Sequence, residues 1–330
     1  MSMLNHFFDY KPEVLALDEK ALELCQPYFK QMEDIRDYNQ LKMLKAFADT
    51  QMSSTDMLGT TGYGLWDSGR AKLEQIFAEV MGAEDALVRS QFQSGTHTLA
   101  VALFGLLRAG DTLLAATGRP YDTLEGVIGL DGKGKGTGTL MDYGIKYDEA
   151  PLKADFTPDY ELIAQKAPGA KVCHIQRSRG YLQRNAFDLD TIRKVADTAR
   201  AANPDIIIFV DNCYGEFTQK EEPLPGRCRP SWWASLIKNP GGGIAPTGGY
   251  IAGRKDLVEL CAYRLNAPAS ARSWAVPSRR PAICIWASTT PRRGLRSHQD
   301  GHLRPVPAGT GGQKAHPALL RGSQRHRHLL

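Results

Sequence analysis

A lysine in an unusual setting lies in the segment Ser235-Leu-Ile-Lys238-Asn-Pro-Gly-Gly-Gly. Lys238 follows a short apolar stretch and precedes a glycine run, which a solvated surface charge explains poorly. Desolvation favours the neutral form of a lysine amine, and the neutral amine is the nucleophile that attacks carbonyl groups. Ser235 can add a hydroxyl to a phosphate. Taken alone, this segment still allows an ordinary surface lysine.

A second candidate segment, Gln93-Ser-Gly-Thr-His97, follows a predicted strand and opens a predicted helix. The small residues Ser94, Gly95 and Thr96 allow backbone N–H groups to approach an anion at the positive end of the helix. Ser, Gly and Thr also form ordinary helix caps, so an ordinary cap remains the alternative.

A third candidate, Asp211, ends the most apolar stretch of the chain, Ile-Ile-Ile-Phe-Val. Ligands of open α/β sheets bind beyond the carboxyl ends of the strands. An aspartate that emerges there can pair with a protonated ring nitrogen, as in pyridoxal 5'-phosphate (PLP), which needs this pairing to act as an electron sink. The alternative for Asp211 is a turn or cap residue.

The order of these segments, a phosphate turn, then an aspartate, then S-x-x-K, resembles that of fold type I PLP enzymes. The closer resemblance is to the cysteine/methionine-metabolism group, and within it to the methionine gamma-lyase-like proteins often labelled aluminium-resistance proteins. The resemblance covers about residues 50–265. It is carried by T-G-Y-G-L-W-D-S-G-R-A-K-L-E, S-G-T-H-T-L-A, A-T-G-R-P-Y-D-T-L-E, I-Q-R-S-R-G-Y, V-D-N-C-Y-G-E-F and S-L-I-K-N-P-G-G-G-I-A-P-T-G-G-Y-I-A-G-R.

This resemblance implies roles for matching residues. Lys238 would hold PLP as a Schiff base and move protons, and Asp211 would pair with the pyridine nitrogen. The phosphate would be held by residues of the turn and of the S-x-x-K segment, namely Ser94, Gly95, Thr96 and Ser235.

Four further residues are candidates for the site. Tyr63 resembles the tyrosine that such enzymes lend to a neighbouring subunit's phosphate site, which implies a homodimer or homotetramer. Tyr121 is a candidate for stacking on the cofactor ring, with a buried helix-start tyrosine as the alternative. Ser178 and Arg179 would form a wall of the site, and structural salt bridging is the alternative for Arg179.

The implied activity is that of a PLP-dependent carbon–sulfur lyase acting on a small sulfur-containing amino acid. The mechanism would transfer the imine from Lys238 to the substrate, after which Lys238 would remove the Cα proton and a β or γ substituent would leave. A PLP aminotransferase or decarboxylase on the same scaffold is the enzymatic alternative.

The elements that must position these residues alternate between apolar strands and amphipathic helices, which predicts a mainly parallel α/β sheet buried on both faces. The resemblance implies the PLP-dependent transferase-like large domain with a seven-stranded type of sheet. We expect a helical segment over residues 1–60 and the PLP-binding domain over 61–265. The predicted strands are 86–89, 112–116, 171–175, 205–211 and 249–252, and the predicted helices are 68–82, 95–107, 160–166, 189–202 and 255–263.

Residues 266–330 form an atypical basic tail. From Ala269 onward there are eleven Lys or Arg and one acid, a net charge of +10. The whole chain has a net charge of +5, so residues 1–268 carry −5. The family match ends there, so the C-terminal small domain is predicted to be missing or disrupted. A shifted reading frame is one explanation, also for Leu224–Ala234, where the resemblance predicts an acidic apolar strand. A non-catalytic protein with a nucleic-acid-binding tail is the rival from another class.

Other features exclude function classes. No apolar run approaches the roughly 20 residues of a membrane span. The six cysteines are scattered without a C-x-x-C pair, which argues against zinc and disulfides and for the cytoplasm. Gly129, Gly134 and Lys135 nearly match a phosphate-binding loop, but Gly136 stands where a Ser or Thr is needed. A surface loop is therefore the preferred interpretation of this segment.

Overall fold

The computed structural model describes residues 7–58, 60, 67–132, 134–223, 231–236, 238–241 and 245–268. The chain divides into two compact units, residues 1–31 with 297–330, and residues 32–296. The described part of the first unit, 7–31, contains the amino-terminal part of helix α2 (Pro12–Asp49). The sheet and every described candidate residue belong to the second unit.

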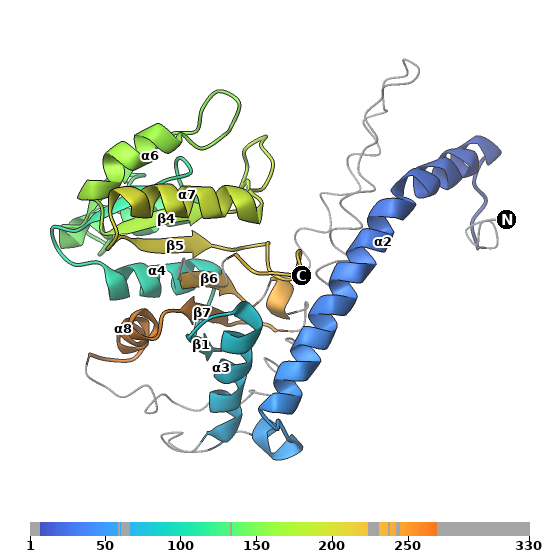
Figure 1. Ribbon diagram of the computed structural model, residues 1–330, viewed down its shortest axis with the longest axis horizontal. Coiled ribbons are helices and arrows are strands. Elements are labelled where there is room, and N and C mark those ends of the chain that lie inside the picture. The colour runs from blue at the N-terminus through green and yellow to red at the C-terminus, as the bar shows by residue number, and fades with distance from the viewer. Residues whose placement is uncertain are drawn as a thin grey trace. The chain divides into compact units, whose positions relative to one another are not determined.

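A single sheet forms the centre of the second unit (Figure 1). Among the described residues it has seven strands, which lie in the order β1 (Asp85–Arg89), β7 (Gly249–Gly253), β6 (Ser231–Ser235), β5 (Ile207–Asp211), β4 (Val172–Gln176), β2 (Thr112–Ala115) and β3 (Lys146–Glu149). β7 is antiparallel to both of its neighbours, and the other pairs are parallel. The prediction of a mainly parallel seven-stranded α/β sheet is confirmed.

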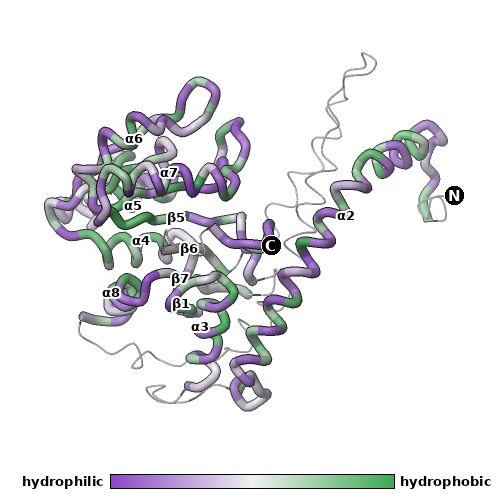
Figure 2. Tube along the Cα trace, viewed as in Figure 1, coloured by the Kyte–Doolittle hydropathy of each residue, from purple (hydrophilic) through white to green (hydrophobic). Residues whose placement is uncertain are grey.

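Helices cover both faces of this sheet. The helices are α3 (Ser68–Met81), α4 (Gly95–Leu106), α5 (Asp122–Ile128), α6 (Tyr160–Lys166), α7 (Leu189–Ala202) and α8 (Lys255–Leu265). One buried cluster takes side chains from α3, α6, α7 and the carboxyl-terminal part of α2, and a second takes them from α4, α5 and α8. The central strand β5 is buried along its whole length and begins with a hydrophobic run (Figure 2). A sheet covered in this way explains the continuous apolar strands of the sequence.

Helix ends follow the local signals in the sequence. Asp67 caps α3 by accepting a hydrogen bond from the Arg70 backbone N–H at 2.9 Å, and Gly82 ends the helix with φ of 68°. Asp159 and Asp188 cap α6 and α7 in the same way. Short polar side chains suit this position because they satisfy N–H groups that the helix itself leaves unpaired. The helix predicted from Asp67 or Ser68 to Gly82 is confirmed.

Two elements differ from the expectation. β3 and α5 were not predicted. β6 lies where the resemblance predicts a strand, although the sequence there departs from the family and was suspected of a shifted frame. The backbone of Ser231–Ser235 pairs with β5 on one side and β7 on the other, so two ladders hold it in place. Residues 224–230 and 269–330 lie outside the described residues. The predictions of a basic tail, a changed frame and a missing small domain therefore stay predictions, as do the domain boundaries.

The glycine-rich loop after α5 binds a carboxylate of its own chain. Asp142 accepts hydrogen bonds from the backbone N–H groups of Gly136, Gly138 and Thr139, each at 3.0 Å. These bonds, that from Gly136 first, lower the pKa of Asp142 to about 2. Backbone N–H groups that could cradle a phosphate are thus engaged by Asp142, which supports the surface-loop interpretation.

Within the described part of the chain, no helix has both the length and the apolar character needed to cross a membrane.

The first turn of α3 packs directly on the short helix Ser54–Met57. A Cβ atom added at Gly69 would lie 1.8 Å from the backbone oxygen of Asp56. We therefore expect Gly69→Ala to lower the free energy of unfolding by about 1–3 kcal/mol, as overpacking does elsewhere. Urea denaturation monitored by circular dichroism measures this change.

Gly169→Ala is the matched control, because a Cβ at Gly169 meets no atom within 4 Å. Its free energy of unfolding should stay close to that of the unchanged chain. Equal effects of the two substitutions would contradict the close contact at Gly69.

Candidate functional site

The candidate residues gather at one edge of the sheet. β4, β5 and β6 are parallel, so their last residues, Gln176, Asp211 and Ser235, lie at the same edge. β1 runs in the same direction because β7 is antiparallel to both β1 and β6, and the chain enters α4 shortly after β1. Open α/β sheets bind ligands at this edge.

The amino end of α4 has the form of an anion site. The Ser94 hydroxyl accepts a hydrogen bond from the His97 backbone N–H at 3.1 Å and caps the helix. Gly95 and Thr96 are the first two helical residues, whose N–H groups the helix leaves without intrahelical partners. The Thr96 hydroxyl lies 2.9 Å from that of Thr123 and 3.3 Å from that of Tyr121. Hydroxyls and backbone N–H groups therefore meet at the positive end of the helix dipole.

Tyr121 is tied to the end of β4. Its backbone N–H donates to Gln176 Oε1 at 2.9 Å, and Gln176 Nε2 donates to the Ser178 carbonyl at 3.1 Å. Burial raises the pKa of Tyr121 to about 12, and the nearby charge of Asp211 adds to this effect. The phenol thus stays neutral. The sequence did not single out Gln176, because the predicted strand ended one residue earlier.

Asp211 is a buried carboxyl, 3% exposed, at the end of β5. Oδ1 accepts a hydrogen bond from the Cys213 backbone N–H at 3.2 Å. Burial raises the pKa of Asp211 to about 6, although this hydrogen bond and the charge of Lys238 act in the opposite direction. A protonated ring nitrogen is a cation that also donates a hydrogen bond, so the site fits the PLP pyridine ring in charge and in hydrogen bonding.

Lys238 is half-buried beyond the end of β6. Its Nζ lies 3.2 Å from the Tyr214 hydroxyl and 4.9 Å from the centre of the Tyr214 ring. Since the charge of Lys238 also acts on Asp211, the structure brings Lys238, Asp211 and Tyr121 into one electrostatic neighbourhood. Tyr214 was not predicted, although it follows Asp211 by three residues.

The loop after β4 is held by Arg184. This guanidinium donates to the carbonyls of Ser178 at 2.6 Å and Gln176 at 3.2 Å, and it lies 4.0 Å from the ring centre of Phe187. Ser178 is thus fixed through its backbone beside Gln176. Arg179 is exposed.

Two predicted site residues have no described side chain. Tyr63 lies outside the described residues, and Ser235 is described through its backbone alone, which pairs with Gly249 at the end of β6. Their predicted roles at a phosphate stay predictions.

Buried ionisable groups lie near Asp211. Arg177 donates to Asn212 Oδ1 at 2.7 Å, and Asn212 Nδ2 donates to Glu222 Oε2 at 3.1 Å. Glu216 is fully buried, and burial raises its pKa to about 8. At neutral pH the Glu216 carboxyl is therefore mainly protonated, which limits the negative charge around Asp211.

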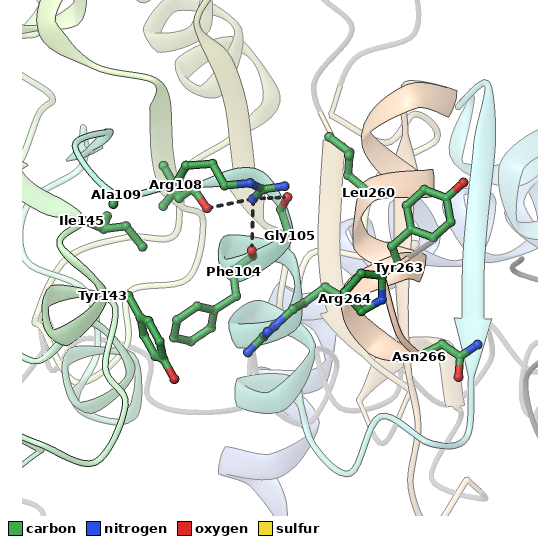
Figure 3. Close-up of a pocket in the computed structure, with 12 residues that line it drawn as sticks. Phe104, Gly105, Arg108, Ala109, Tyr143, Ile145, Leu260, Tyr263, Arg264 and Asn266 are labelled. Atoms are coloured by element: carbon green, nitrogen blue, oxygen red, sulfur yellow. Dashed lines mark hydrogen bonds between the residues drawn. The ribbon is translucent and has the colours of Figure 1, made fainter. Parts of the chain in front are cut away.

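A cavity of about 700 Å³ lies elsewhere, at the carboxyl end of α4 (Figure 3). Arg108 faces it but donates three hydrogen bonds to the carbonyls of Phe104, Gly105 and Leu107, so it completes the helix end. Along α4, eight residues, or about 12 Å of helix, separate Thr96 from Phe104, the first residue of the helix that lines this cavity. No group of His, Cys, Asp and Glu among the described residues could hold a metal ion.

Sequence comparison assigns most of the chain to one family. A model of the family described as methionine gamma-lyase matches residues 14–275. The uncharacterized protein YnbB of Bacillus subtilis (strain 168) is 44% identical over 247 residues, which are 74% of this chain and 58% of YnbB. The chain thus spans less than two thirds of that relative.

Solved structures resemble this one closely. A carbon–sulfur lyase involved in aluminum resistance from Clostridium novyi NT gives a TM-score of 0.81 at 39% identity, covering 88% of this chain and 68% of its own. A candidate cystathionine beta-lyase involved in aluminum resistance from Listeria monocytogenes gives 0.82 at 40% identity, covering 86% and 71%. The PLP-dependent protein YhfS from Escherichia coli shares the fold at 17% identity, with a TM-score of 0.58 and coverage of 82% and 67%. The predicted resemblance and the predicted fold type I are confirmed.

The burial of Asp211 predicts a specific pH dependence of stability in the cofactor-free chain. The pKa of Asp211 rises from 3.8 to about 6 on folding, so its contribution to stability is fully present below about pH 4 and is lost as the pH rises through 6. Asp211→Asn removes this loss. The free energy of unfolding of the variant, relative to that of the unchanged chain, should be about 2 kcal/mol higher at pH 8 than at about pH 4.5.

Urea titrations of the cofactor-free chains at both pH values measure this gain. Asp205→Asn is the control, because it changes an exposed carboxyl just before the same strand. A stability difference for Asp211→Asn that does not change with pH would contradict the buried, perturbed carboxyl.

Proposed function

Because the chain belongs to the methionine gamma-lyase family, we propose that it is a PLP-dependent carbon–sulfur lyase acting on a sulfur-containing amino acid. The matched region leaves part of each longer relative uncovered, so this activity is proposed for the chain from its own site. The observation that carries the proposal is the convergence of Lys238, Asp211 and the amino end of α4 at one edge of the sheet.

Each member of this group offers a different element of PLP recognition. Lys238 offers an amine for a Schiff base, and Asp211 offers a buried carboxylate for the pyridine nitrogen. Gly95 and Thr96 offer backbone N–H groups and a hydroxyl for a phosphate, with Ser94 capping the helix beside them. These groups come from segments far apart in sequence, and one ligand with an aldehyde, a ring nitrogen and a phosphate satisfies all of them.

When bound, PLP supplies an electron sink for the charge that develops at the substrate Cα. The chain's own residues do the rest. The Asp211 carboxylate would pair with the ring nitrogen and would keep it protonated. Lys238 Nζ would hold and move the proton between the substrate Cα and the leaving group, and the neutral Tyr121 phenol would stack on the ring.

The proposal also covers the substrate, the oligomeric state and the cellular location of the enzyme. Relatives described as lyases of cystathionine or of carbon–sulfur bonds support a small sulfur amino acid as the substrate. The expected loan of Tyr63 to a neighbouring subunit supports a homodimer or homotetramer. The free cysteines Cys25, Cys173, Cys213 and Cys261 support a cytoplasmic location.

Covalent trapping tests the proposed role of Lys238. The full chain mixed with PLP should develop a visible absorption band, and borohydride should then attach a phosphopyridoxyl group to the peptide that contains Lys238, as identified by mass spectrometry. Lys238→Ala should lose both the band and the label, because Lys238 is the lysine whose charge acts on Asp211.

Lys135→Ala is the matched control, since it removes an exposed lysine from the glycine-rich loop. It should keep the band and the label. A chain that stays colourless with added PLP, or a label that persists in Lys238→Ala, would contradict the proposed function.

Product analysis tests the reaction class. A lyase should release a keto acid and ammonia from cystathionine, methionine or cysteine, and Lys238→Ala should lower the rate by at least about a hundredfold, as expected when an acid–base group is removed. Transfer of the amino group to an added keto acid, or release of carbon dioxide, would instead identify an aminotransferase or a decarboxylase.

A further inference from the structure

We propose that Tyr214 is a positioning residue for Lys238, whose hydroxyl holds the lysine amine in the orientation in which it attacks a carbonyl carbon. This inference rests on the proposed function of Lys238 and adds a residue to it. The contact itself joins two segments that are far apart in sequence, the turn after β5 and the turn after β6.

The contact places one hydroxyl and one aromatic ring beside the amine. Nζ lies 3.2 Å from the Tyr214 hydroxyl oxygen and 4.9 Å from the ring centre. A phenol oxygen accepts a hydrogen bond from a lysine ammonium, and the phenol O–H donates one to the lone pair of a neutral amine. Tyr214 can therefore stay bonded to Lys238 in both protonation states.

A side-chain clamp fixes the backbone of Tyr214 to the residue next to Lys238. Asn239 Nδ2 donates to the Tyr214 carbonyl at 2.8 Å and to the Glu216 carbonyl at 3.2 Å. Any shift of the turn after β5 would therefore have to break bonds to the segment that carries Lys238. The distance between the two side chains is set by this clamp rather than by the flexible lysine alone.

The other side of the same turn is also fixed. The Gly215 N–H donates to the Asn212 carbonyl at 2.6 Å. A Cβ atom at Gly215 would lie 2.0 Å from the Arg177 guanidinium, which itself donates to Asn212 Oδ1. The turn that carries Tyr214 is thus held between a buried arginine and the Asn239 clamp.

Orientation matters for this amine because correct placement of a nucleophile contributes strongly to the rate of its reaction. A lysine side chain has four rotatable carbon–carbon bonds and many rotamers of similar energy. Tyr214 restricts these rotamers because its hydroxyl contacts Nζ and its backbone is held by Asn239. The residue itself is 52% exposed. Loss of the hydroxyl should change the placement of the amine without unfolding the chain.

Labelling kinetics test this role on the full chain freed of PLP. PLP is added, samples are reduced with borohydride at increasing times, and the labelled Lys238 peptide is quantified by mass spectrometry. Tyr214→Phe keeps the ring and removes the hydroxyl. It should slow labelling of Lys238 by roughly three- to tenfold, the range expected for one net hydrogen bond.

Pyridoxal, which lacks the phosphate, separates positioning from cofactor contact. If Tyr214 acts on the amine, Tyr214→Phe slows labelling by pyridoxal and by PLP to the same extent. Slowing confined to PLP would mean that Tyr214 contacts the phosphate, and it would overturn the inference. Equal labelling rates in Tyr214→Phe and the unchanged chain would overturn it too.

Two controls make the outcome specific. Tyr181→Phe removes the hydroxyl of a tyrosine that is 83% exposed, and it should leave the labelling rate unchanged. The thermal unfolding midpoints of both variants should match that of the unchanged chain. If the unchanged chain itself acquires no label at Lys238, the proposed function fails first, and this result is distinct from a normal label that Tyr214→Phe does not slow.

Discussion

The site depends on one unfavourable interaction, the burial of the Asp211 carboxyl at the end of β5. The pKa shift from 3.8 to about 6 corresponds to a cost on the order of 3 kcal/mol for keeping this group ionised in the folded chain. This cost is the net value, because one backbone N–H and the nearby charge of Lys238 already lower it. A cationic partner with an N–H group would offset this cost. Asp211 would therefore bind such a partner strongly, while its burial lowers the stability of the chain without the partner.

The groups around Asp211 limit further unfavourable burial of charge. Glu216 is buried close behind it, and the raised pKa keeps that carboxyl mainly protonated at neutral pH. Arg177 and Asn212 connect the end of β5 to Glu222, while Asn39 of α2 donates to the carbonyls of Phe217 and Gln219. The same network that balances the charges also fixes the turn that carries Tyr214. Stability and placement of Lys238 are therefore coupled through one set of buried contacts.

Local signals made part of this site predictable. The caps of α3, α6 and α7 and the apolar run of β5 are each encoded within a few residues, and Asp211 and Lys238 occur in motifs with a family resemblance. Gln176, Tyr214 and Asn239 could not be found in this way, because their roles arise only where β4, β5 and β6 end side by side. The same reason applies to β6, whose backbone is held by two neighbours from distant parts of the chain. The engagement of Asp142 with the glycine-rich loop likewise appears only in three dimensions.

The pairing of Asp211 with the cofactor can be read from the protonation state of the ring nitrogen. PLP labelled with ¹⁵N at the ring nitrogen can be bound to the full chain and observed by NMR at about pH 8, where free carboxyl groups are ionised. We expect the chemical shift of a protonated pyridine nitrogen in the unchanged chain, and that of an unprotonated nitrogen in Asp211→Asn. An unprotonated ring nitrogen in the unchanged chain, with PLP bound at Lys238, would contradict this pairing.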